Sequence, residues 1–200
     1  MEERRTKKER RELKKEEEFL RFHREQRTKT FLKWGIIAVV VTVIAVGGWW
    51  VIKESNKPLP GQFFENQGRD HVTQEKWDKF KYNSNPPTSG PHDPVWTKAG
   101  IYNKPQGDGH LVHSLEHGYV IISYNCKADE KSCTDLVKQL SDVANEQKLW
   151  KLILVPRPEL DTRIALTAWT RIDKFNTFDK DRMVNFISAF RDHGPEQTME

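Results

Sequence analysis

The sequence predicts an α+β domain, with a mixed sheet and packed helices, attached to one N-terminal transmembrane helix. Two observations predict this architecture. Trp34–Ile52 is a run of nineteen residues without a charge, and it follows a strongly charged N-terminal arm. Further along, apolar segments with strand and helix periodicity follow one another in the order β-α-β-β-α, after a long irregular loop region.

The charged arm, residues 1–33, holds thirteen Lys/Arg and eight Asp/Glu, whereas the rest of the chain holds 20 and 21. Its composition is typical of a solvated helix or a disordered segment. Such an arm either contacts anionic lipid headgroups or only sets the membrane topology. Because the excess positive charge belongs to the arm, the basic pI does not indicate that the folded domain binds nucleic acid.

The uncharged run Trp34–Ile52 would span about 28 Å as a helix at ~1.5 Å per residue, close to the thickness of a bilayer core. Tryptophans mark both of its ends, as expected at a membrane interface. The preceding charged region is too long for a cleaved signal peptide. Lys and Arg crowd the N-terminal flank, which predicts a cytoplasmic N-terminus and places residues 53–200 on the extracytoplasmic side.

A polar, proline-containing linker is expected over residues 53–61, followed by an extracytoplasmic globular domain over residues 62–200. The first half of this domain is irregular, because residues 83–94 and 104–109 are rich in proline and glycine. Regular structure is expected from Gly118 onwards. The expected elements are a strand over Tyr119–Tyr124, a helix over Thr134–Gln147, strands over Leu149–Val155 and Arg163–Thr170, and a helix from about Asp179 to Gly194-Pro195.

Both cysteines, Cys126 and Cys133, lie on the expected outer side of the membrane. Oxidising surroundings favour a disulfide between them. Six intervening residues is not a usual metal-knuckle spacing, so a disulfide is favoured over a metal pair or two free thiols.

Three histidines and a glutamate fall within eight positions, His110 to His117, directly before the first expected strand. Imidazole is the commonest metal ligand. If this segment is helical, His113 and His117 share a face and Glu116 points in a neighbouring direction, as a ligand, a general base or a supporting partner. His92 lies in a rigid proline-rich loop. The spacing alone is not diagnostic of a metal site.

Not every histidine is equally informative. His110 follows Gly109 in a loop, and His193 lies at a helix C-terminus, where the helix dipole alone favours an imidazolium. Ordinary surface positions are expected for both. The isolated serines Ser89 and Ser114 match no nucleophile motif and are expected in turns or loops.

Two segments, Pro86–His92 and His113–Tyr124, closely resemble a bacterial family of membrane-anchored proteins catalogued as domain of unknown function 3105. Further resemblance is carried by Gly68–His71, Ala165–Trp169 and Gly194–Glu196. The resemblance covers roughly residues 60–197. It implies a single membrane span with an exported domain, and it gives weight to four residues inside the motif blocks: His71, His92, Glu116 and His117. The family name implies no activity.

The main hypothesis is an extracytoplasmic domain that binds a transition metal, either copper or zinc. The core ligands would be His92 and His117. His71 and His113 are further candidates, and Glu116 would orient or complete the site.

Two alternatives belong to other classes of protein. In the first, an envelope enzyme uses Glu116 and His117 as acid–base groups. In the second, the histidines are structural and the domain is an interaction module with a binding face of Trp96, Tyr102 and Trp169. The distance between the two motif loops distinguishes the hypotheses, because a metal site requires the loops to converge.

Overall fold

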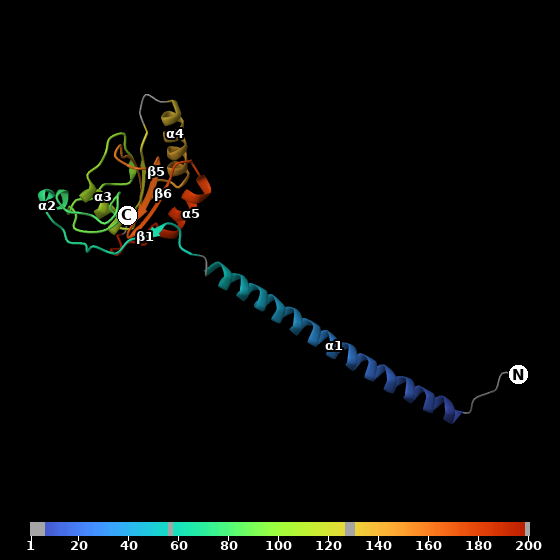
Figure 1. The fold of residues 1–200 in the computed structure, drawn as a ribbon. Helices are drawn as coiled ribbons and strands as arrows, with labels where there is room; N and C mark the ends of the chain where they lie inside the picture. The colour runs from blue at the N-terminus through green and yellow to red at the C-terminus, as the bar shows by residue number, and fades with distance from the viewer. Residues whose placement is uncertain (1–6, 56–57, 127–130, 199–200) are drawn as a thin grey trace. The chain divides into compact units, whose positions relative to one another are not determined.

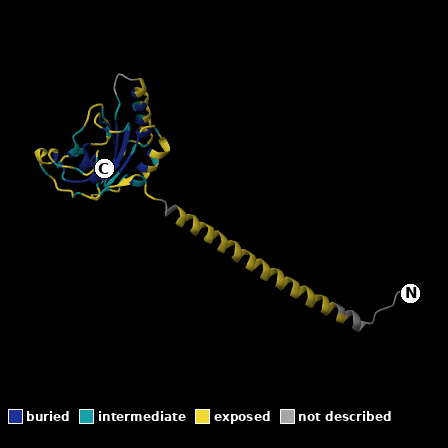
Figure 2. Ribbon diagram, in the orientation of Figure 1, coloured by how far each residue is buried: buried dark blue, intermediate teal, exposed yellow. Residues whose placement is uncertain are grey.

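The computed structural model describes residues 7–55, 58–126 and 131–198, and it divides into two compact units, Met1–Pro58 and Leu59–Glu200. The expected arm and linker include residues 1–6 and 56–57, which lie outside the described residues. In the first unit, a single helix, α1 (Lys7–Ser55), contains the whole uncharged run (Figure 1). Its described side chains are exposed (Figure 2), and by length and composition this helix could cross a membrane.

The second unit confirms the α+β class: one mixed sheet with helices packed on it. Its elements in chain order are β1 (Gln62–Phe63), α2 (Gln74–Asp78), β2 (Gly100–Ile101), α3 (Asp108–Glu116), β3 (Val120–Tyr124), α4 (Lys131–Glu146), β4 (Leu152–Pro156), β5 (Ile164–Ala168), β6 (Arg171–Phe175) and α5 (Lys180–Phe190).

The sheet has the strand order β1-β6-β5-β3-β4-β2. At its centre, β3 pairs in parallel with β4 and antiparallel with β5, so that Ile122 lies opposite Leu154 on one side and Leu166 on the other. The parallel β3–β4 pair is connected through α4, whereas β5 and β6 form an antiparallel hairpin. The start of β3, where the histidine-rich run ends, therefore lies in the middle of the sheet.

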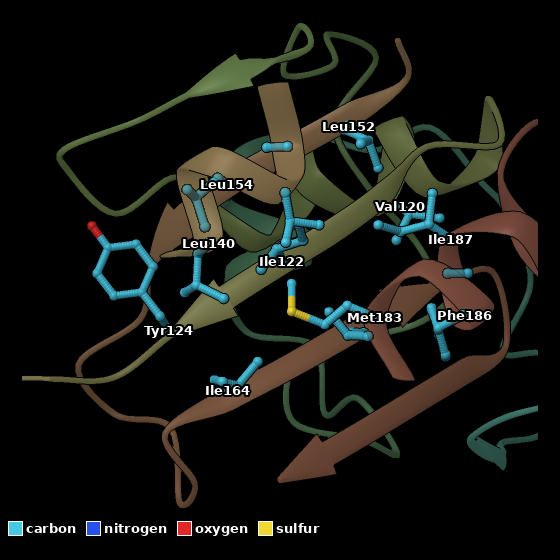
Figure 3. Packing of buried hydrophobic residues seen from close by; sticks show 14 of the residues in the cluster. Val120, Ile122, Tyr124, Leu140, Leu152, Leu154, Ile164, Met183, Phe186 and Ile187 are labelled. Atoms are coloured by element: carbon cyan, nitrogen blue, oxygen red, sulfur yellow. The ribbon is translucent and has the colours of Figure 1, made fainter. Parts of the chain in front are cut away.

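Both faces of the central strands are buried. Alternate residues Val120 and Ile122 point into the larger core, which α4 and α5 complete with residues such as Leu140, Met183 and Phe186 (Figure 3). The intervening strand residues Ile121, Ile153 and Val155 point to the opposite face. Together with Tyr119, just before β3, they pack against Leu111 and Leu115 of α3 in a second core. Burial on both faces explains why β3 reads as a continuous apolar run rather than an alternating one.

The order of elements differs from the expected β-α-β-β-α in one respect in its second half, because β6 follows β5 directly. The expected single strand Arg163–Thr170 ends at Ala168, and the chain turns through Thr170, which has a φ of 60°. Strand β6 was not expected from the sequence because it contains charged residues. One of them, Asp173, is buried, and the guanidinium of Arg182 binds its carboxylate with N–O distances of 2.8 and 2.6 Å.

The segment before Gly118 is also less irregular than expected, since it contains β1, α2, β2 and α3. Three of these elements are only two to five residues long, which is too short for a periodic pattern. The expected strand Leu149–Val155 begins later, at Leu152. Leu149 has a φ of 53° and donates its N–H to Ala144 O, so it caps α4 instead.

Two other expectations are confirmed. Asp179 is the N-cap of α5, and its side chain accepts a hydrogen bond from the backbone N–H of Arg182 at 3.0 Å. The Sγ atoms of Cys126 and Cys133 lie 2.09 Å apart, as in a disulfide.

Candidate metal centre

The last turn of α3 presents His113 and Glu116, and His117 follows as the C-cap. Residues three and four apart lie on the same side of a helix, so these three side chains are neighbours. The turn packs against the central sheet through Leu115, and all of these side chains are buried. The metal hypothesis required this segment to be helical, so that His113, Glu116 and His117 become neighbours, and the helix over Asp108–Glu116 meets that requirement.

His71 and His92 reach this turn from two loops that pair with each other. The backbones of His71 and His92 form an isolated parallel bridge. Val72 donates its N–H to His92 O at 2.8 Å, and His92 donates its own to Asp70 O at 3.0 Å. This pairing brings together side chains that are twenty-one positions apart in the sequence.

The four side chains of His71, His92, His113 and Glu116 form one cluster, hereafter the His/Glu cluster. One nitrogen or oxygen atom from each lies within 4.8 Å of all the others. Glu116 Oε2 lies 2.9 Å from His92 Nε2 and 3.6 Å from His71 Nε2. His92, His113 and Glu116 are buried, whereas the side chain of His71 is 46% exposed. The cluster therefore has three interior members and one at the surface.

Backbone carbonyls fix the orientation of two imidazoles. His92 Nδ1 lies 2.7 Å from Gly90 O, and His113 Nδ1 lies 2.7 Å from Asp93 O. A carbonyl only accepts, so each Nδ1 must carry the proton. In a neutral ring, each Nε2 then keeps its lone pair. The Nε2 atom of His92 lies 2.9 Å from Glu116 Oε2, and that of His113 lies 3.1 Å from His117 Nε2. Metal-bound histidines are typically held in this way.

Burial lowers the pKa of His113 from 6.5 to about 4, and the hydrogen bond to Asp93 offsets only part of this effect. The neighbouring histidines, when charged, lower the pKa further. His113 is therefore neutral at pH 7, which is the state in which imidazole binds a metal.

His117 lies at the edge of the His/Glu cluster rather than at its centre. Its Nε2 atom is 3.1 Å from His113 Nε2 and 3.9 Å from Glu196 Oε2. The sequence placed His117 among the core ligands, but the four donor atoms that converge belong to His71, His92, His113 and Glu116.

Two charged residues next to the cluster were not singled out from the sequence. Arg69 Nη1 lies 3.7 Å from Glu116 Oε1, and Glu196 faces His117. Both fall inside short segments that carried the family resemblance, Gly68–His71 and Gly194–Glu196. That position was the only signal that could have identified them.

The remaining candidates have other roles. Ser114 Oγ donates to Thr97 O at 2.7 Å and accepts the N–H of Thr97 at 3.0 Å, which ties α3 to the preceding loop. Ser89 Oγ accepts the N–H of Gln67 at 3.1 Å. His110 lies outside the His/Glu cluster, with its Nδ1 atom 2.7 Å from Val95 O. The serines hold loops together and are not arranged as nucleophiles.

The three aromatic residues considered as a binding face are partly buried and pack against the second core: Trp96, Tyr102 and Trp169. The ring of Trp96 lies 5.0 Å from that of His117 and 5.6 Å from that of His113. The ring of Trp169 lies 6.4 Å from that of His92. Trp96 and Trp169 therefore pack beside the histidines of the site.

Two buried cations hold α3 in place. At its start, Arg157 pairs with Asp108 at 2.5 Å and donates to Asn85 Oδ1 in the proline-rich loop at 3.0 Å. Beyond its end, Lys151 donates to His117 O at 3.0 Å and to Asp192 Oδ1 at 2.6 Å. Such partners satisfy buried charge and limit the movement of the turn that carries the cluster.

The C-terminal segment packs tightly against the same turn. A Cβ atom on Gly194 would collide with the carbonyl oxygen of Glu116 and the amide nitrogen of Gly118. The N–H of Glu196 in turn donates to Glu116 O at 3.1 Å. Only glycine at position 194 allows this approach.

A hollow of about 510 Å³ opens beside the exposed member of the cluster. Its lining includes His71, Thr73, Lys76, Asp93 and Pro94. The cluster therefore has solvent and an open volume on its His71 side, while backbone and core surround the rest.

The fold and the site together define a class of protein: an α+β domain with a histidine–carboxylate cluster at the start of a central strand, following one long apolar helix. Residues 71–200 match the family described as protein of unknown function (DUF3105), and the chain belongs to this family. His71 is the first matched residue, so the whole His/Glu cluster lies inside the family region. No curated protein and no solved structure matches the chain.

Proposed function

We propose that this domain binds one transition-metal ion, copper or zinc, through His71, His92, His113 and Glu116. One observation carries the proposal. Backbone carbonyls hold the Nδ1 atoms of two imidazoles, the Nε2 atom of His92 lies 2.9 Å from the buried carboxylate of Glu116, and all four donor groups lie within 4.8 Å of one another. A purely structural network has no need of so many proton-accepting groups at one point.

The donor set and its spacing suit such an ion. In a tetrahedral site with bonds of about 2.0–2.1 Å, donor atoms lie about 3.4 Å apart. The distances from Glu116 Oε2 to His92 and His71, 2.9 and 3.6 Å, lie on either side of this value. Imidazole nitrogen with one carboxylate oxygen is typical of both zinc and copper sites. A cation would also compensate the buried charge of Glu116.

The proposal includes the location of the site. The uncharged run of α1 would cross the membrane, with the N-terminus in the cytoplasm and the metal centre on the extracytoplasmic side. Exposed apolar side chains along α1 and the basic residues before Trp34 support this arrangement. The basic residues would contact anionic lipid headgroups. Reporter fusions at each terminus, of which only the C-terminal one is expected to be active outside the cytoplasm, test the orientation.

An enzymatic use of the same centre is the second candidate, with Glu116 and His117 as acid–base groups. The hollow beside His71 favours it, because a substrate could approach there. The interaction-module hypothesis is less well supported, because His92 and His113 converge, with ring centroids 5.0 Å apart.

The test is metal analysis of the full-length protein, purified in detergent and loaded in turn with zinc and copper. One equivalent per chain is expected, with a large loss in His92→Ala, whose side chain is buried at the centre of the cluster. His193→Ala is the matched control, because the side chain of His193 lies against Arg191 O, outside the His/Glu cluster. Substoichiometric metal in the wild type, or unchanged binding in His92→Ala, would contradict the proposal.

A further inference from the structure

The surface side of the His/Glu cluster differs from its interior. His71 is the only half-exposed member, and it forms part of the wall of the 510 Å³ hollow. Arg69 and His71 are two positions apart, and both side chains reach Glu116, at 3.7 and 3.6 Å. This side is where a molecule from solution can reach a bound ion.

The charges on this side become unbalanced when a metal binds. Lys76 and Asp93 line the hollow with opposite charges, and Arg69 and Glu116 form a second pair of opposite charges beside His71. A divalent ion adds two positive charges. The carboxylate of Asp93 cannot rotate toward the ion without losing two hydrogen bonds. It accepts the N–H of Val95 at 2.9 Å and Trp77 Nε1–H at 3.2 Å.

We propose that the metal-loaded centre binds a small oxyanion, a carboxylate or a phosphate, which enters through the hollow and coordinates the metal beside His71. This inference rests on the proposed metal site and names the ligand class of that site. Arg69 recognises the oxyanion, since a guanidinium matches carboxylate and phosphate geometry, and Lys76 adds a positive charge at the rim.

The geometry supports a small ligand rather than a protein segment. The volume of about 510 Å³ lies within the range of small-molecule sites. Three of the four proposed metal donors are buried, so an oxyanion reaches the ion only from the His71 side, in a fifth coordination position beside the four protein donors. An oxyanion fills such a position with one oxygen and leaves the others for Arg69.

The test uses full-length protein loaded with cobalt(II), whose visible absorption reports its coordination. Cobalt content is measured first, and acetate and inorganic phosphate are then added separately at constant ionic strength, with perchlorate as the salt control. A saturable spectral change is expected with at least one of the two, and which anion produces it distinguishes carboxylate from phosphate. Arg69→Gln and Lys76→Gln are expected to raise the half-saturating concentration about two- to fivefold.

Lys79→Gln is the matched control, because Lys79 pairs with Glu75 at 2.8 Å and does not line the hollow. It should leave anion binding unchanged. A cobalt-loaded protein whose spectrum responds to neither anion, or responds equally in all three variants and the wild type, overturns this inference alone. Failure to bind cobalt, zinc or copper overturns the proposed metal site, and this inference with it.

Discussion

His92 Nε2 lies 2.9 Å from Glu116 Oε2, and both side chains are buried from solvent. The other ring nitrogen of His92 is committed to Gly90 O, so this contact must hold either a shared proton or an ion. A metal ion that binds between these two atoms would displace any proton held there.

Glu116→Gln should preserve the shape of the side chain but remove its charge. We expect affinity for zinc or copper to fall by at least about 100-fold, because even supporting partners of metal ligands contribute 10- to 100-fold. Isothermal titration calorimetry measures this loss. Glu196→Gln is the control, since Glu196 is half-exposed and lies outside the His/Glu cluster. Equal effects of the two substitutions would mean that Glu116 is not a ligand.

The metal-free protein should lose stability in mild acid because of His113. Its pKa is about 4 in the folded protein and 6.5 in a free chain. Above pH 6.5 the residue is neutral in both states. As the pH falls from 6.5 to 4, the unfolded chain takes up a proton that the folded protein does not, so the free energy of unfolding decreases, by up to about 3 kcal/mol in total.

Chemical denaturation between pH 4 and 7 measures this dependence, and His113→Gln should show a smaller slope over the same range. An NMR titration of the His113 ring gives an independent readout that does not depend on how well the variant folds. A midpoint near 6.5 would show that the site is more hydrated than the structure indicates.

Local sequence spacing was sufficient to predict part of the site. His113 and Glu116 are three apart, and a single helical turn brings them together, as the histidine-rich run suggested. The approach of His92 could be expected only from the family resemblance. No local pattern encodes the backbone bridge between His71 and His92, because it joins loops far apart in the chain.

Two further features of the site depend on the tertiary fold in the same way. His117 shares a helix face with His113, but which of the two lies at the centre depends on where His71 and His92 arrive. Lys151 falls inside the expected strand Leu149–Val155 but precedes β4, and its side chain is buried because Asp192 and two carbonyls from distant parts of the chain surround it. Such contacts depend on the tertiary fold, which the local sequence does not determine.

Gly194→Ala should destabilise the domain. The added Cβ meets the backbone of Glu116 and Gly118, which cannot move without shifting the turn that carries the cluster. Overpacking of this kind costs about 1–3 kcal/mol. Thermal unfolding measures the loss, and metal affinity should fall with it. Gly100→Ala is the control, because its nearest neighbour is a Tyr102 side-chain atom at 3.5 Å, an ordinary contact. Equal stability of both variants would contradict the tight packing at Gly194.

Reduction of the Cys126–Cys133 disulfide should lower stability but leave metal affinity unchanged. The bond closes a short ring, with a sequence separation of 7, so its entropic contribution is at most about 2.5 kcal/mol. His117 precedes β3 and Cys126 follows it, and at about 3.3 Å per residue the five-residue strand alone separates them by roughly 16 Å. Among the described residues, the two sites are therefore too far apart to couple through direct contacts. Zinc titrations of oxidised protein and of Cys126→Ser/Cys133→Ser measure affinity, because a thiol reductant would itself bind the ion. A change in affinity of more than about tenfold in the double variant would show that the two ends of β3 are coupled and that the strand is not a rigid support for the site.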